Sequence, residues 1–128
     1  MITTTDASNI VYKDCKSFGM NIFQKGQIQS EEITEPRIVI HVKRQTTETY
    51  WKKGFIEVNF MIPDINGEAD LVKLNEIEKD AVSRLESVGV HDNSHFRYTV
   101  HSSCMEKDDS MKCHFINVRL LFEVLNIK

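Results

Sequence analysis

The sequence has no long apolar run, little cysteine and no excess of positive charge, and each shortage excludes a class of protein. No stretch approaches the roughly 18 apolar residues that a membrane-spanning helix needs, so we expect no membrane partner. The net charge of −3 argues against a dedicated or sequence-specific nucleic-acid binder, because such proteins use basic stripes to neutralise phosphates. Residues 1–6 show neither a basic segment nor an apolar core, so we expect no signal peptide.

Three cysteines are too few for a disulfide framework, and we predict that they are free thiols. Two of them, Cys104 and Cys113, stand near His101 and His114, and a hairpin would bring all four toward its tip. Zinc accepts such ligands, but no Cys-x-x-Cys spacing occurs. His114 and Cys113 are also neighbours on a strand, so their side chains point to opposite faces. Surface or core roles are therefore favoured, and we predict no metal site and no cofactor.

Catalytic signatures are absent or incomplete. The segment 101–103 (His-Ser-Ser) matches half of a two-histidine phosphoesterase pattern, but the second His-x-Ser/Thr motif is missing. Cys113 as a nucleophile would need a histidine base within hydrogen-bond reach, and His114 diverges from it. The glycines are isolated, so there is no phosphate-binding loop. We predict that the protein is not an enzyme and has no catalytic residues.

The residues that are present predict one globular domain spanning 1–128. A length of 128 residues suits a single core, and 41% hydrophobic with 27% charged residues is typical of folded chains. A helix is predicted from a cap at Thr5 or Asp6 to Gly19, where a helix commonly ends. Residues 20–35 are interpreted as an irregular connection, with a short strand around Ile22 or Ile28 as an option.

Period-two alternation predicts strands over 37–44, 55–62, 96–104 and 113–125. An apolar stripe at helical spacing predicts a second helix over 68–88; its members are Leu71, Leu74, Ile77, Ala81, Leu85 and Val88. Residues 45–53 are interpreted as a polar loop and residues 105–112 as an acidic hairpin loop. The predicted order is α-β-β-α-β-β. Because each strand has one apolar face, we expect an α+β fold with a mainly antiparallel sheet of about four strands and both helices on one face.

Two features indicate contacts with other proteins. The loop residues Tyr50, Trp51, Lys52 and Lys53 combine aromatic and basic side chains of the kind favoured at interfaces. Alternatively, Trp51 folds back over the edge of the core. The second feature is an outer sheet face with apolar side chains, which favours partners over solvent; its members are Val39, Met61, Phe115 and Leu121.

The layout from about residue 35 onward resembles the tail-completion or tail-terminator family of long-tailed bacteriophages and prophages. The features that carry this resemblance are 36–40 (PRIVI), 51–60 (WKKGFIEVNF), the polar turn into a helix over 69–85, and a hairpin that ends over 118–124. The N-terminal helix also fits the family. Proteins of this family are structural: they form rings, often hexameric, that close the tail tube or join it to the head. The family has no catalytic residues.

The resemblance implies a structural virion component that forms a homo-oligomeric ring, such as a hexamer, and binds other tail or head–tail connector proteins. It would be found in the virion, and in the host cytoplasm before assembly. We predict a head-to-tail contact in which residues 50–53 meet the acidic residues Glu106, Asp108 and Asp109 of the next subunit. The alternative is a small ligand-binding or regulatory α+β module with a pocket between its sheet and its helices.

Overall fold

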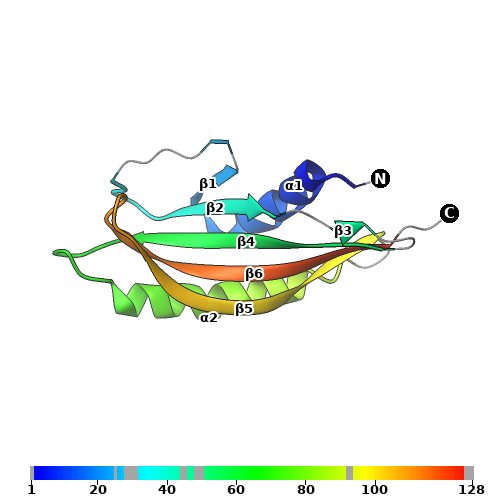
Figure 1. The fold of residues 1–128 in the computed structure, drawn as a ribbon. Helices are drawn as coiled ribbons and strands as arrows, with labels where there is room; N and C mark the ends of the chain where they lie inside the picture. The colour runs from blue at the N-terminus through cyan, green and yellow to red at the C-terminus, as the bar shows by residue number, and fades with distance from the viewer. Residues whose placement is uncertain are drawn as a thin grey trace.

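The computed structural model describes residues 2–24, 26–27, 32–43, 46–47, 51–91 and 94–125 and has an α+β fold (Figure 1). The elements are α1 (Thr4–Cys15), a 3₁₀ turn (Lys16–Phe18), β1 (Asn21–Gln24), β2 (Arg37–Val42), β3 (Thr46–Thr47), β4 (Trp51–Pro63), α2 (Leu71–Val88), β5 (Phe96–Asp108) and β6 (Cys113–Leu125). Five strands form one sheet in the order β1-β2-β4-β6-β5, and β3 pairs with the start of β4.

The sheet is mixed rather than wholly antiparallel, and it has more strands than the predicted four. β1 pairs with β2 in parallel, with Ile22 opposite Ile38, whereas the other strand pairs are antiparallel. The prediction of a short strand around Ile22 is confirmed. The connection over 25–36 is long enough to return the chain to the same end of the sheet, which a parallel pair requires.

The strands β4, β5 and β6 each contain 13 residues and run beside one another over their whole length. The predicted loops at 45–53 and 105–112 were therefore partly wrong. Residues 51–53 lie in β4 opposite the end of β6, and residues 105–108 lie in β5 opposite its start. Pairing with β6 outweighs the polar composition of both segments, because strand formation depends on the neighbouring strand more than on intrinsic preference.

The first helix begins earlier than predicted because Thr3, and neither Thr5 nor Asp6, is its cap. The Thr3 hydroxyl accepts a hydrogen bond from the Asp6 N–H, and the Asp6 carboxylate accepts one from the Thr3 N–H, each at 3.0 Å. This reciprocal arrangement places Asp6 inside the first turn. Gly19, with φ of 71°, ends the segment as expected.

The second helix begins at Leu71 rather than at residue 68, because the Asp70 side chain caps it by accepting a hydrogen bond from the Lys73 N–H at 3.2 Å. The predicted stripe is buried in its middle, at Leu74, Ala81 and Leu85, but Leu71 at the start of the helix is 63% exposed. No helix within the described residues is long and apolar enough to cross a membrane.

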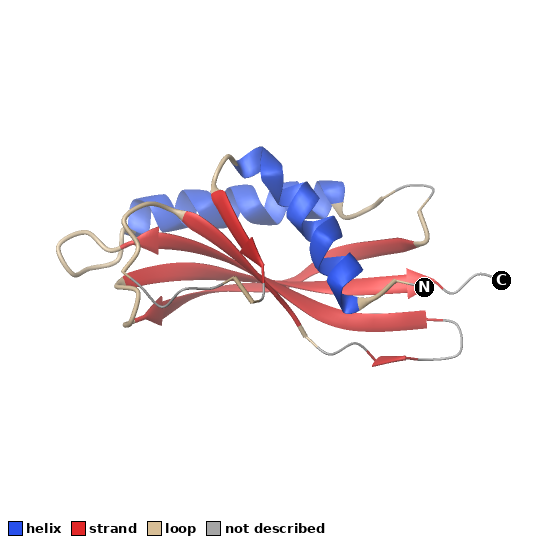
Figure 2. Ribbon diagram, turned by 90° about the horizontal axis from the view of Figure 1, so that it is seen from above, coloured by secondary structure: helices blue, strands red, loops and turns tan. Residues whose placement is uncertain are grey.

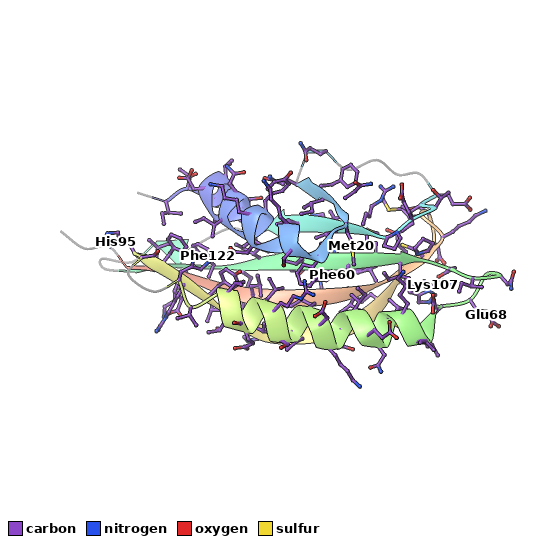
Figure 3. All side chains as sticks on the ribbon, turned by 180° about the vertical axis from the view of Figure 1, so that it is seen from behind. Met20, Phe60, Glu68, His95, Lys107 and Phe122 are labelled. Carbon is purple, nitrogen blue, oxygen red and sulfur yellow. The ribbon has the colours of Figure 1, made fainter. Side chains whose placement is uncertain are left out.

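The core lies between the two helices and one face of the sheet, and both helices pack on that face as predicted (Figure 2). From the sheet it contains Ile38, Ile40, Ile56, Val58, Phe60, Ile62, Tyr98, Ile116, Val118, Leu120, Phe122 and Val124. Phe60 and Phe122 lie on this side of the sheet in Figure 3, and Phe18 packs edge-on against Phe60 with ring centroids 5.0 Å apart. The opposite, outer face of the sheet carries no helix among the described residues.

Candidate functional site

The outer face is divided into a covered half and an uncovered half. Near the β5–β6 turn, Val39, Met61 and Cys113 are buried beneath Ile33 and Met111, whose backbones share a hydrogen bond of 3.1 Å. The expectation that Val39 and Met61 offer an apolar surface to partners was therefore wrong. The segment around Ile33 comes from the β1–β2 connection, and its position over the sheet could not be inferred from alternation alone.

On the other half of the outer face, three side chains from neighbouring strands pack together into what we call the outer platform: Phe55, His101 and Arg119. The Arg119 guanidinium lies 3.9 Å from the centroid of the Phe55 ring, and the His101 ring meets Phe55 edge-on at 5.2 Å. The Arg119 Nε is buried and has no hydrogen-bond partner among the described residues. The outer platform is thus a cation stacked on an aromatic ring, with an unused donor.

The predicted acidic contact residues lie at the β5–β6 turn and in the last residues of β5, a region that we call the tip. Asp108 uses its carboxylate within the turn, where Oδ1 accepts hydrogen bonds from the Ser110 hydroxyl at 2.7 Å and from the Met111 N–H at 3.1 Å. Glu106 is exposed, and so is Asp109, which forms a surface ion pair with Lys107 at 3.1 Å. Asp108 therefore holds the turn together, whereas the other two carboxylates face solvent.

Of the predicted aromatic and basic contact residues, those that the structure describes, 51–53, lie at the opposite end of the sheet, beside the end of β6. Tyr50 is outside the described residues, and only the backbone of Trp51 and Lys52 is described. Lys53 is half-buried and stands opposite Glu123. Figure 3 shows the two ends through the labelled side chains of His95 and Lys107. A strand of 13 residues spans roughly 40 Å, so the two predicted contact regions cannot meet within one subunit.

The four residues considered as zinc ligands do not converge. Cys113 is buried next to the turn, and Cys104 is exposed further along the hairpin, opposite Asn117. His114 points to the helix side, where its Nδ1 lies 2.7 Å from Oδ1 of Asp64. Within the parts of the chain that the structure describes, no group of three or more His, Cys, Asp or Glu side chains could hold a metal ion.

A second polar cluster, which the sequence did not predict, joins α1 to the start of β5. The Asp14 carboxylate accepts a hydrogen bond from the Tyr98 hydroxyl at 2.6 Å and lies 2.7 Å from Nε2 of His91. Burial, followed by this hydrogen bond, raises the pKa of Tyr98 far above its ordinary value. The hydroxyl therefore stays protonated and ties elements together. Asp14 is more than 70 positions away from both His91 and Tyr98 in the sequence, so no local spacing could have revealed this cluster.

A hollow of about 700 Å³ lies at the tip end of the molecule, between residues 32–34, the 63–67 turn and the β5–β6 hairpin. Its charged walls are already paired, with Lys112 at 3.2 Å from Glu32 and Lys107 at 3.1 Å from Asp109. The ligand-binding alternative expected a pocket between the sheet and the helices. In the described residues that space is filled by the core.

The three thiols should differ sharply in reactivity. Burial, with help from nearby carboxylates, raises the pKa of Cys15 and of Cys113 to about 12, whereas Cys104 is exposed. Its pKa is also raised, by partial desolvation and by neighbouring acids. At pH 8 we expect iodoacetamide to add one group to the native protein, at Cys104, and three after denaturation. Mass spectrometry of intact and digested protein tests this, and rapid native labelling of Cys15 would contradict the packing of α1.

Comparisons of the sequence with protein-family models and with curated proteins find no match. A solved structure of a protein described without a functional name is similar over 94% of this chain and 93% of its own length, with a TM-score of 0.54 and 10% sequence identity. It is one of 19 solved chains that match. At this identity the similarity shows a shared fold alone.

Proposed function

We propose that the protein is a structural subunit of a phage or prophage particle, similar to tail-completion or tail-terminator proteins, and that it acts by binding its neighbours. The observation that carries this proposal is the placement of the two predicted contact regions at opposite ends of one elongated sheet. The α+β arrangement, with a long terminal hairpin, is compatible with the family that the sequence resembles.

The opposite placement favours a head-to-tail contact. Residues 51–53 stand at the start of β4, and the acidic tip stands roughly 40 Å away at the other end of the same sheet. A contact between two different patches repeats from one subunit to the next, and it closes into a ring when the rotation allows. The proposed assembly is such a ring, for example a hexamer, at the tail end or at the head–tail junction, bound there by other tail or connector proteins.

The experiment that tests this function is complementation. The gene is deleted from its resident phage or prophage, and wild-type protein or the Trp51→Ala variant is supplied in trans. Because aromatic anchors dominate interfaces, we expect Trp51→Ala to lower the number of completed particles by about tenfold or more. Electron microscopy and plaque counts measure this yield.

The matched control is Val72→Ala, which removes an apolar side chain that is 73% exposed on α2, on the helix side of the sheet. It should give wild-type yields. Normal particle numbers from a stably folded Trp51→Ala protein would show that residues 50–53 do not form the contact. Normal particle numbers in the absence of the gene would contradict the proposed function.

A further inference from the structure

Arg119 stands out on the outer face because one of its donors is buried and unused. Its guanidinium is stacked on the Phe55 ring at 3.9 Å, and its Nε has no hydrogen-bond partner among the described residues. Buried polar groups in proteins nearly always have a partner, so this guanidinium is short of acceptors within the described part of the subunit. Arg119 as a whole is half-buried, so an acceptor from another molecule would meet the Nη groups and not the buried Nε.

Two carboxylates near Arg119 contact other side chains instead. Glu57 faces Arg119 across the β4–β6 pair, but Oε1 of Glu57 lies 3.8 Å from Nζ of Lys43 and accepts a hydrogen bond from Nδ2 of Asn117 at 3.3 Å. Glu123, further along β6, lies 3.7 Å from Nε of Arg97. No carboxylate in the described ranges forms an ion pair with Arg119.

The outer platform holds this guanidinium in a defined position. Phe55 supports one face of the guanidinium, and His101 packs edge-on against the same ring. His101 lies at the irregularity in β5 between Val100 and Ser102, and such bulges re-aim side chains. A guanidinium stacked on a ring keeps the donors around its edge, where a planar carboxylate can accept two parallel hydrogen bonds.

We propose that Arg119 receives a carboxylate from the acidic tip of a neighbouring copy of this chain, Glu106 or Asp109. Both side chains are exposed, whereas the Asp108 carboxylate is occupied within the turn. Within one subunit Glu106 stands opposite Phe115, roughly 13 Å along β6 from Arg119, and Asp109 lies beyond Cys113, roughly 20 Å away. Neither carboxylate forms an ion pair with Arg119 in the described residues. This inference rests on the proposed self-assembly, and it assigns the tip carboxylates to Arg119 of the outer platform in place of Lys52 and Lys53.

Charge reversal with rescue tests the pairing. Three variants enter the complementation assay: Arg119→Glu, the double change Glu106→Arg with Asp109→Arg, and all three changes together. We expect each of the first two to lower the particle yield by at least about tenfold, because an unmatched or like charge is left in the contact. The combined variant should recover most of the yield, because the charges are exchanged. Arg119→Lys should give an intermediate yield, because lysine lacks the planar fork.

The control is Lys73→Glu, a charge reversal at an exposed position of α2 on the opposite side of the sheet. It should leave the yield unchanged, and thermal melts of every variant should show a folded protein. A folded Arg119→Glu variant with wild-type yield, beside a defective Trp51→Ala variant, would overturn this inference and keep the proposed function. Loss without rescue in the combined variant would overturn the pairing with the tip. Normal yield without the gene would overturn both proposals.

Discussion

Replacing Leu74 with alanine is expected to lower the free energy of unfolding by about 2–5 kcal/mol. Leu74 is only 2% exposed and lies in the main core, on the side of α2 that faces the sheet. Truncation removes buried methyl groups and leaves a cavity, since the strands beneath are held in register by β6 and cannot collapse into it. Guanidinium titration followed by circular dichroism measures the change.

Leu71→Ala is the matched control, because it makes the same chemical change in the first turn of the same helix. Leu71 is 63% exposed, so its truncation should change the unfolding free energy by less than about 0.5 kcal/mol. Equal effects at the two positions would mean that α2 is rotated relative to the sheet. A loss below about 0.5 kcal/mol at Leu74 would mean that this face of the helix is not packed.

Gly89→Ala is expected to destabilise the protein by about 2–4 kcal/mol, although alanine normally favours helices. A Cβ at this position would stand 2.4 Å from the carbonyl oxygen of Tyr98 and 2.8 Å from that of Leu85. Both obstacles are backbone atoms, so α2 or β5 must move. The same close approach allows the Gly89 carbonyl to accept a hydrogen bond of 2.9 Å from the Tyr98 N–H.

Ser87→Ala provides the comparison for Gly89, because it is an exposed residue in the last turn of the same helix. It should shift the melting temperature by no more than a degree or two, since surface changes rarely exceed about 0.5 kcal/mol. A neutral or stabilising Gly89→Ala substitution would show that the end of α2 and the start of β5 are further apart than this packing requires.

Much of the architecture follows from local pattern. Alternation along 113–125 predicts β6 at its observed bounds, and it assigns Phe115 and Arg119 to the outer face and Ile116 to the core. The stripe of α2 likewise predicts that Leu74 is buried. These inferences succeed because side-chain direction repeats every two residues in a strand and every 3.6 residues in a helix, whatever the rest of the chain does.

The candidate site depends mostly on contacts that the sequence does not bring together. The acidic composition of the tip was recognised from the sequence. The sequence could not show that the Asp108 carboxylate accepts hydrogen bonds within the turn. It also missed the outer platform, because Phe55, His101 and Arg119 come from three different strands and meet only through register and a bulge.

The sequence by itself determined the α+β class, the faces of the long strands and the buried middle of the α2 stripe, because each depends on residues a few positions apart. The tertiary structure decided the parallel pairing of β1 with β2 and the burial of Val39 beneath Ile33. It also decided that the Arg119 Nε has no hydrogen-bond partner among the described residues. Each of these depends on which distant segment fills a given space. That choice is made by the free energy of packing the whole chain, and no local pattern encodes it.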